Sequence, residues 1–438
     1  MNGDRSAVFL RPRLLYARLL GVCLWLAWGI SLILGDGQTD ATGQLLGADH
    51  LAVYTAARFL QEGRAAELYD HQAFTLAQEA YFPPGVWQGK LEAFRNPPFF
   101  AILYLPTASW PYPASAAFWM LVSLLSLTLA TRWLFPEKPW STLGWALTFY
   151  PVFATVSYGQ NSLLSLAVFA AVIRLLEGNH RFLAGVAAGL LWFKPTLLIG
   201  LVIWTLIDIR RLWPCALGAA ISGCTLSLGS FLLYPEAWSA FFQSLSSNVA
   251  FLDFDLWKMH NPRAFWTLLL PTPIRLGSGI TLQLLLILVT IALGIALFAR
   301  LARTYGNDCR VMVAAAVLLT LWCSPHTMIY EWSLALIPAI LLLRISALNS
   351  EDWLVFVATG WLALLLSTDL ARFQQQLQRD WLGIAATSIV QISMPIVAAV
   401  AWLTVVKLEA RFAGQKTGSG VAAQSEVLDH PAVATDNQ

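Results

Sequence analysis

The stretch Ile280–Ala299 reads ITLQLLLILVTIALGIALFA, twenty consecutive residues without a charge. A helix needs about 20 mostly apolar residues to cross a bilayer, so this stretch predicts a transmembrane helix. The rest of the chain has the same character: 58% of its 438 residues are hydrophobic and only 12% are charged, whereas soluble domains carry about 25% charged residues. The sequence therefore predicts an all-α, polytopic membrane protein.

Other apolar segments repeat this pattern and bring the predicted number of transmembrane helices to about 12. The first follows a group of arginines and lacks the small-residue cleavage site of a signal peptide, so we expect an uncleaved helix. The predicted spans, with approximate edges, are 19–34, 112–131, 141–157, 162–176, 182–193, 196–208, 213–233, 277–301, 311–324, 328–343, 353–368 and 382–406.

Two of these segments, 182–193 and 196–208, are short, and Lys194 lies between them. One continuous helix would place Arg210 and Arg211 outside the cell, whereas a hairpin of two short helices keeps both inside. Because basic residues prefer the cytoplasm, the hairpin is the predicted arrangement. The resulting topology assigns 17 of the 27 Lys and Arg residues to the cytoplasmic side and nine to the outer side. Both termini then lie in the cytoplasm.

The longer connections fall on the predicted outer side, chiefly a first extracytoplasmic loop at 35–98 and a second at 234–276. One transmembrane domain would cover 1–411, and the polar segment 412–438 would form a disordered cytoplasmic tail. Loops that a rigid scaffold presents often carry function, so we expect an extracytoplasmic working face. The net charge of only +2 argues against a nucleic-acid partner.

Asp49 precedes a segment in which Leu51, Tyr54, Ala57 and Leu60 recur at helical spacing. This pattern predicts an amphipathic helix on the membrane surface, with Asp49 at its start. Two roles are open for the carboxylate. It can cap the helix, which the residues alone favour, or it can act as a general base.

Lys194 is the most informative single residue, because an ionisable group inside an apolar run costs about 2.5–3.5 kcal/mol on insertion scales. One interpretation is a lysine at a helix end whose ammonium reaches the interface. The other is a counter-charge for an anionic ligand, for which phosphate is the natural candidate.

Polar residues also occur at two predicted outer turns. Gln160 and Asn161 lie between the third and fourth spans, where they either bind sugar hydroxyls or simply form a polar turn. His326 and Glu331 lie at the mouth of the bundle. Two roles are open for His326. It can lie in an interfacial turn with its hydrogen bonds made within the protein, or it can face a phosphate or a sugar.

The second outer loop contains Lys258 and His260, which are candidate substrate-binding residues. Asp253 and Asp255 nearby form a D-x-D pattern, which binds metal–nucleotide-sugar complexes in soluble transferases. A single match of this kind is weak, so no metal site is predicted. The chain shows no P-loop and no G-x-S-x-G motif in a fitting context, which removes the usual markers of nucleotide-driven transport and serine hydrolysis.

Five motifs follow one another over roughly residues 45–345: the Asp49 segment with Leu68–Asp70, Asn96–Pro106 with Trp110, Gly159–Asn161, Ala184–Pro195, and Ser324–Glu331. Taken together and in this order, they resemble the motifs of the bacterial glycosyltransferase family 87, within the integral-membrane GT-C superfamily. Two positions depart from that family's pattern: Asn96 stands where tyrosine is frequent, and Glu331 where aspartate is usual.

The resemblance implies a GT-C-like bundle in the bacterial inner membrane, with an outward-facing active site. It implies transfer of a sugar, often mannose, from a polyprenyl-phosphate donor to a glycan or glycolipid acceptor, by an inverting mechanism and without a metal or other cofactor. Asp49 would then be the catalytic base, and Lys194 and His326 would bind the donor phosphate. The candidates for binding the rest of the substrates are Gln160, Asn161, Glu331, Lys258 and His260.

Three other functions stay open at this point. A secondary transporter with 12 spans would use Lys194 as a substrate or coupling charge, although two halves with matching broken helices are not evident. A polymerase or ligase would use a diphosphate-linked glycan donor on the same face. A non-enzymatic scaffold that handles lipids would tolerate loss of the Asp49 carboxylate.

Overall fold

In the computed structural model, five helices are long and apolar enough to cross a membrane, counted over the described residues 5–83, 86, 91–247, 256–276, 280–345, 350–378 and 388–428. Every regular element in these ranges is helical and none is a strand, which confirms the all-α prediction. These apolar helices indicate a multi-pass membrane protein. The five are Tyr112–Leu134, Ile209–Leu233, Leu282–Tyr305, Asp352–Gln376 and Ser393–Ala410.

Four shorter apolar helices coincide with other predicted spans, and the total of 12 stays a prediction. They are Arg18–Leu34, Arg181–Phe193, Pro195–Ile207 and Cys309–Cys323.

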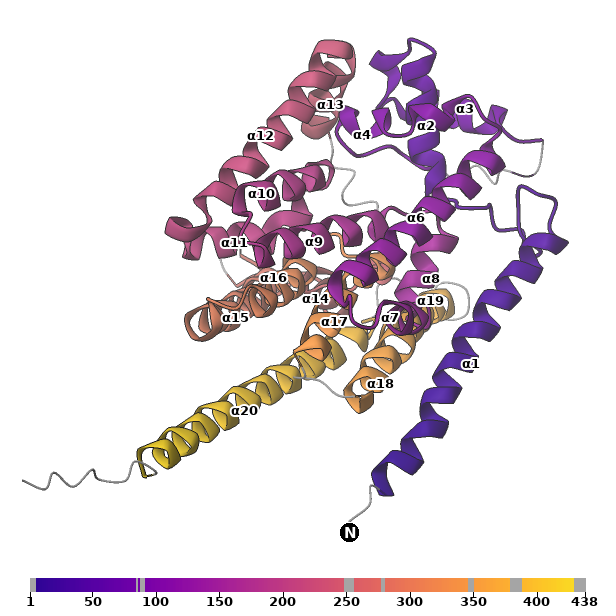
Figure 1. The fold of residues 1–438 in the computed structure, drawn as a ribbon. Coiled ribbons are helices and arrows are strands. Elements are labelled where there is room, and N and C mark those ends of the chain that lie inside the picture. The colour runs from indigo at the N-terminus through magenta and orange to yellow at the C-terminus, as the bar shows by residue number, and fades with distance from the viewer. Residues whose placement is uncertain are drawn as a thin grey trace, which may run out of the picture.

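The helices follow one another along the whole described chain (Figure 1). The first ten are α1 (Arg5–Leu34), α2 (His50–Gln61), α3 (His71–Ala80), α4 (Pro98–Ile102), α5 (Leu105–Ala108), α6 (Tyr112–Leu134), α7 (Pro139–Ala146), α8 (Tyr150–Ser157), α9 (Ser162–Glu177) and α10 (Arg181–Gly189). The others are α11 (Ile199–Ile207), α12 (Ile209–Leu233), α13 (Pro235–Ser247), α14 (Pro262–Leu269), α15 (Leu282–Tyr305), α16 (Cys309–Cys323), α17 (Leu336–Arg344), α18 (Ser350–Ala358), α19 (Leu366–Gln376) and α20 (Ser393–Leu428).

Local sequence explains where several of these helices begin. Proline occupies the first turn of α4, α6, α7, α8 and α14, a position where its missing N–H costs nothing. Aspartate caps two others: Asp70 accepts hydrogen bonds from the first backbone amides of α3, and Asp308 does so for α16.

The loop predicted to be the first outer loop contains the helix predicted after Asp49. In α2, the side chains of Leu51, Tyr54, Ala57 and Leu60 are all buried, with at most 4% exposed. The helix is therefore confirmed, but protein covers its apolar face, where the pattern alone predicted a membrane surface. Figure 1 shows α2, α3, α4 and α13 gathered at one end of the molecule.

The predicted hairpin around Lys194 is also present. The helix α10 leads through the 3₁₀ turn Leu190–Phe193 to Lys194, whose backbone is extended (φ −137°, ψ 79°). After Lys194 the chain runs back toward the start of α10. There, Nη1 of Arg181 donates a hydrogen bond to the carbonyl oxygen of Arg211, at 3.2 Å. The two ends of the segment thus lie together, as the distribution of basic residues predicts.

The hairpin packs on α12 through glycine. A Cβ added at Gly218 would collide with the backbone of Phe182, whereas one added at Gly229 on the same helix would meet nothing within 4 Å. We expect Gly218→Ala to destabilise the protein by about 1–3 kcal/mol and Gly229→Ala to stabilise it by about 0.5–1 kcal/mol. Thermal unfolding of the two detergent-solubilised variants tests this, and equal melting temperatures would contradict it.

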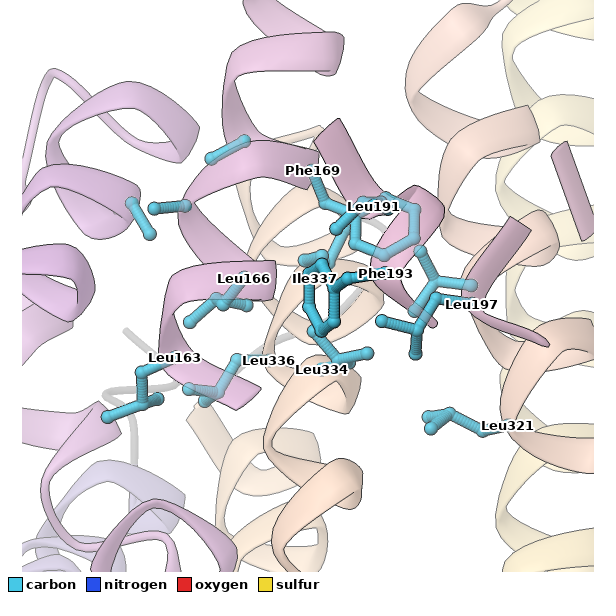
Figure 2. Close-up of a cluster of buried hydrophobic side chains, with 14 of the residues drawn as sticks. Leu163, Leu166, Phe169, Leu191, Phe193, Leu197, Leu321, Leu334, Leu336 and Ile337 are labelled. Atoms are coloured by element: carbon cyan, nitrogen blue, oxygen red, sulfur yellow. The ribbon is translucent and has the colours of Figure 1, made fainter. Parts of the chain in front are cut away.

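Buried hydrophobic side chains on both sides of Lys194 belong to one packed cluster (Figure 2). The ring of Phe193 stacks on Phe100 with centroids 4.2 Å apart, and Leu191 and Leu197 on either side of the turn are buried. They meet Ile337 of α17 in the same cluster. Since lipid is as apolar as these side chains, close packing rather than transfer from water holds such a cluster together.

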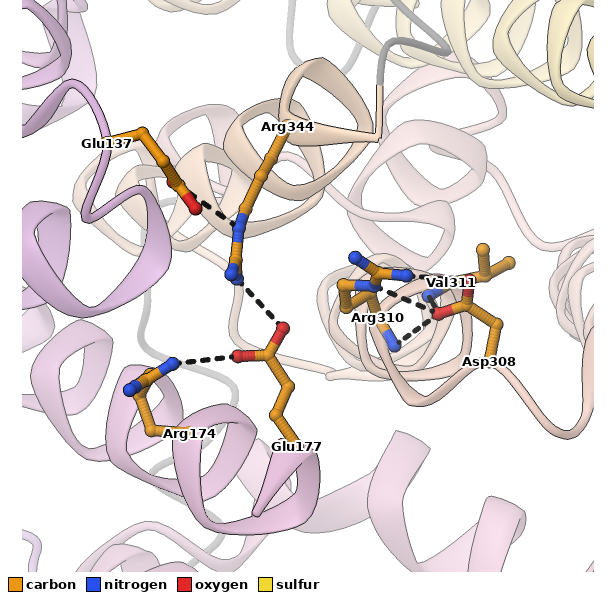
Figure 3. Close-up of polar contacts among 7 residues, drawn as sticks. All are labelled: Glu137, Arg174, Glu177, Asp308, Arg310, Val311 and Arg344. Atoms are coloured by element: carbon orange, nitrogen blue, oxygen red, sulfur yellow. Dashed lines mark hydrogen bonds and ion pairs between the residues drawn. The ribbon is translucent and has the colours of Figure 1, made fainter.

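Ion pairs join the ends of three helices near the carboxyl-terminal end of α9 (Figure 3). Arg344 lies 2.8 Å from Glu177 and 3.7 Å from Glu137, and Arg174 lies 3.3 Å from Glu177. The carboxyl-terminal ends of α6, α9 and α17 are therefore together, on the side that the topology predicts to be cytoplasmic. The 16 residues of α9 span about 24 Å at 1.5 Å per residue, which separates this network from Asn161.

The carboxyl-terminal segment begins with α20. The sequence predicts disorder from residue 412 onwards, whereas the structure describes helix as far as Leu428. Residues 429–438 lie outside the described part of the chain.

Candidate active site

Asp49 stands at the N-cap position of α2, yet its side chain makes no capping hydrogen bond there. Its Oδ2 accepts a hydrogen bond of 2.6 Å from Nε2 of Gln160. Its backbone amide donates to the carbonyl oxygen of Tyr158, at 3.0 Å. The cap role that the sequence favours is therefore wrong, and the carboxylate is instead oriented by the turn before α9.

Glycine makes this contact between the two turns possible. Gly159 has φ +71°, a conformation that side-chain-bearing residues rarely adopt. A Cβ at this position would lie 2.9 Å from the Cβ of His50 and 3.0 Å from the Cα of Gly47. The Gly-Gln-Asn turn thus needs its glycine to bring Gln160 against Asp49.

Asn161 turns its side chain to another partner, the hydroxyl of the buried Tyr104. Of the two amides that the sequence singles out, Gln160 therefore holds the carboxylate and Asn161 contacts an aromatic residue of the neighbouring α4–α5 segment.

Lys194 forms an ion pair with Glu331, which the sequence places 137 residues further on. The Glu331 side chain is only 5% exposed, against 29% for Lys194. The other carboxylate oxygen of Glu331 accepts a 2.7 Å hydrogen bond from the amide of Met328. The ammonium of Lys194 thus points at a buried carboxylate of the protein, and not away toward a membrane interface.

The Asp49–Gln160 pair and the Lys194–Glu331 pair are both connected to α8. Tyr330, next to Glu331, accepts a 3.1 Å hydrogen bond from Oγ1 of Thr155 in α8. Tyr158 follows the last residue of the same helix, and its carbonyl oxygen accepts a hydrogen bond from the amide of Asp49. Thus α8 connects both pairs of candidate residues.

Hydrogen bonds made by Asn96 and His260 bring two arginines toward Lys194 and His326. Nδ2 of Asn96 donates to the carbonyl oxygen of Phe193, at 3.2 Å, which brings Arg95 toward Lys194. The amide of His260 donates to Thr327, at 2.7 Å, which brings the start of α14, with Arg263, toward His326. Sequence reasoning missed both arginines, because charges in polar loops are ordinary there.

Burial and the positive charges around His326 lower its pKa. Burial, followed by the charges of Arg263, Lys194 and Arg95, lowers the pKa of His326 to about 4. At neutral pH its ring is therefore uncharged. Lys194 and the two arginines supply positive charge near His326, and the binding of a phosphate by Lys194 and His326 stays a prediction.

Two candidates from the predicted second outer loop have different surroundings. His260 is buried, with Nδ1 2.8 Å from Oγ of Ser393 and Nε2 2.8 Å from Oγ1 of Thr368. These contacts favour a structural role, in which His260 positions α14. Lys258 is half-buried, with its ammonium 4.9 Å from the ring centroid of Trp257.

The D-x-D pair from the same loop, Asp253 and Asp255, lies outside the described residues.

Buried histidines make the stability of the protein depend on pH. Burial lowers the pKa of His50 to about 3, and its Nε2 contacts Oγ of Ser115 at 3.0 Å. Below the unfolded-state value of about 6.5, only the unfolded chain gains this proton, so stability falls as pH drops toward 3, by up to about 1.4 kcal/mol per pH unit. We expect His50→Gln to reduce the loss of thermal stability between pH 7.5 and 5. An unchanged pH dependence would contradict this.

Comparison with known proteins gives one match. The model of glycosyltransferase family 87 matches residues 94–325, more than half of the chain. This range contains Gln160, Lys194 and Arg263, ends beside His326, and does not include Asp49. No curated protein and no solved structure matches the chain.

Proposed function

The chain belongs to glycosyltransferase family 87, and from this premise we propose that it moves a hexose, mannose in the first instance, from a polyprenyl-phosphate donor to a glycan or glycolipid acceptor. The reaction would take place on the extracytoplasmic face of a bacterial inner membrane. The supporting observation is a carboxylate, Asp49, oriented by Gln160 at the same end of the bundle as Lys194 and two arginines.

Asp49 would act as the base. One of its carboxylate oxygens takes the proton of an acceptor hydroxyl while that hydroxyl oxygen attacks the anomeric carbon of the donor. The bond between this carbon and the phosphate oxygen breaks, and its electron pair leaves with the polyprenyl phosphate. Because one displacement occurs at one carbon, the proposed mechanism inverts the anomeric configuration. Gln160 keeps the carboxylate in place during the attack.

The cations would stabilise the leaving group. A sugar phosphodiester carries one negative charge, and the released phosphate monoester carries up to two, so negative charge grows on the phosphate as the bond breaks. Lys194, Arg95 and Arg263 therefore bind the transition state more strongly than the ground state, which is the condition for catalysis. In this proposal no metal or other cofactor takes part, and neutral His326 contributes hydrogen bonding only.

Transfer by the purified protein tests the proposal. The protein is incubated with polyprenyl-phosphate-mannose and a glycolipid extract, and the lipids are analysed by mass spectrometry. We expect a product one hexose heavier than its acceptor. A parallel incubation with a polyprenyl-diphosphate-linked glycan and an uptake assay in proteoliposomes complete the design.

Each outcome separates the competing functions. Transfer from the diphosphate donor alone would favour a polymerase or ligase and would overturn the proposed donor class. Sugar uptake without any transfer would favour a transporter. Transfer from the monophosphate donor supports the proposal.

A further inference from the structure

Glu92 is a half-buried carboxylate in the same predicted loop as Asp49, and hydrogen bonds of its backbone fix its position. Its amide donates to Oε1 of Gln78, at 3.1 Å, and its carbonyl oxygen accepts from Nε2 of Gln78, at 2.8 Å. Gln78 lies in α3 and is fully buried. The same Nε2 lies 3.5 Å from Oγ1 of Thr55 in α2, the helix that begins after Asp49. Glu92 is therefore held beside α2 and α3, which lie together at one end of the molecule (Figure 1).

The chain that follows Glu92 leads to the positively charged part of the candidate site. Four residues further on, Nδ2 of Asn96 donates to the carbonyl oxygen of Phe193, directly before Lys194. Four residues of fully extended chain cover at most about 14 Å. The segment 92–96 therefore connects α2 and α3 with the turn that carries Lys194.

The charges of Asp49 and Glu92 reach the same two tyrosines. Both carboxylates act electrostatically on Tyr112 and on Tyr330. The hydroxyl of Tyr112 donates to the carbonyl oxygen of Gly47, at 2.8 Å, in the turn before α2. Because the interaction between charges weakens with distance, two carboxylates that act on the same two groups lie in one region. Glu92 thus adds a second negative charge to the surroundings of the proposed base.

The candidate site therefore has a positive part and a negative part. The three cations that act on His326 form the positive part, where an anionic phosphate is favoured. In the negative part, Asp49 and Glu92 repel an anionic group, whereas their oxygens accept strong hydrogen bonds from the hydroxyls of a neutral sugar. In the proposed reaction the acceptor lies at Asp49, where its hydroxyl gives up a proton. The charges there favour an uncharged acceptor rich in hydroxyl groups.

We propose that Glu92 binds the acceptor by accepting a hydrogen bond from a hydroxyl group of its terminal sugar, and that Asp49 and Glu92 together exclude acceptors whose terminal sugar carries an acid group. The inference rests on the proposed function and deepens it by naming the class of the acceptor. A neutral hexose belongs to this class, whereas a uronic acid and a sugar phosphate do not. Glu92 is then a binding residue for the acceptor and does not hold the donor phosphate.

Glu92→Gln removes the charge and keeps the volume of the side chain, and the backbone bonds with Gln78 do not depend on that charge. We expect KM for the glycolipid extract to rise about tenfold, the difference between a hydrogen bond to a charged and to a neutral acceptor. KM for polyprenyl-phosphate-mannose should stay near that of the wild type. Glu79→Gln is the matched control, because Glu79 is exposed and lies next to Gln78 in α3. An unchanged KM for the extract, or an equal rise in both constants, would overturn the inference.

Sugar binding tests the selectivity without relying on transfer. Methyl mannoside and methyl mannosiduronate, in which a carboxylate replaces the hydroxymethyl group, are added separately to the purified protein and observed by saturation-transfer NMR. The wild type should bind the neutral sugar and not the acid. In Glu92→Gln the signal of the neutral sugar should fall and that of the acid should rise. Equal signals from the two sugars in the wild type, no signal from the neutral sugar, or signals that the substitution leaves unchanged would contradict the proposal.

The proposed reaction and the acceptor site can fail separately. If the wild type binds the neutral sugar through Glu92 but transfers no hexose, the proposed reaction fails and the acceptor site stands. If the wild type transfers hexose while Glu92→Gln changes neither KM for the extract nor sugar binding, the reaction stands and Glu92 has no part in acceptor recognition.

Discussion

Asp49→Asn should lower kcat for sugar transfer by about 10²–10⁴-fold, the contribution typical of a positioned general base. The amide oxygen of asparagine can still accept the hydrogen bond from Nε2 of Gln160, so the loop before α2 should keep its position. Only the capacity to take a proton at neutral pH is lost. The measurement is the single-turnover rate with saturating donor and acceptor.

The same substitution at Asp70 is the control. Asp70 lies in the same loop as Asp49 and caps α3 through hydrogen bonds of 2.8 and 3.1 Å from the amides of Gln72 and Ala73. Because asparagine caps helices as well as aspartate does, Asp70→Asn should transfer sugar like the wild type. A folded Asp49→Asn protein with near wild-type turnover would remove this residue as the base.

Lys194→Ala should have the second largest effect, and it should act on both stability and activity. Removing one member of a buried ion pair costs about 3–5 kcal/mol because the other charge stays behind without compensation. Here that charge belongs to Glu331, whose side chain is 5% exposed. Loss of the charge that is proposed to stabilise the leaving phosphate should also lower kcat/KM by about 10²–10³-fold.

A double substitution separates the two effects. Lys194→Met combined with Glu331→Gln removes both charges and keeps similar volumes, so thermal stability should return close to that of the wild type. Sugar transfer should stay low, because the cation is still absent. Recovery of activity together with stability would assign Lys194 a structural role only.

The sequence alone was sufficient to predict the five long apolar helices and the hairpin. Long apolar runs such as Ile280–Ala299 leave few alternatives to a helix in lipid, and the bias of arginine toward one side decides how the segments around Lys194 turn. The burial of α2 could not be predicted in this way. A half-apolar helix has the same pattern whether lipid or protein covers it, and only the tertiary structure shows that protein covers Leu51 and Tyr54.

The residues of the candidate site also differ in whether the sequence could predict them. Lys194 is conspicuous because its surroundings in the sequence are apolar, whereas Arg95 and Arg263 lie in polar loops where arginine carries no signal. What identifies them is the approach of their loops to Phe193 and Thr327. The Lys194–Glu331 ion pair could not be predicted from the sequence either, because no local rule relates residues that far apart in the chain.

The separation of Lys194 from Glu331 has a consequence for biosynthesis. At about 5–20 residues per second, a ribosome adds the 137 residues between them in roughly 7–27 s. During that interval the translocation machinery has to accept a lysine whose counter-ion does not yet exist. Lys194 therefore gains its counter-ion only after Glu331 has been synthesised.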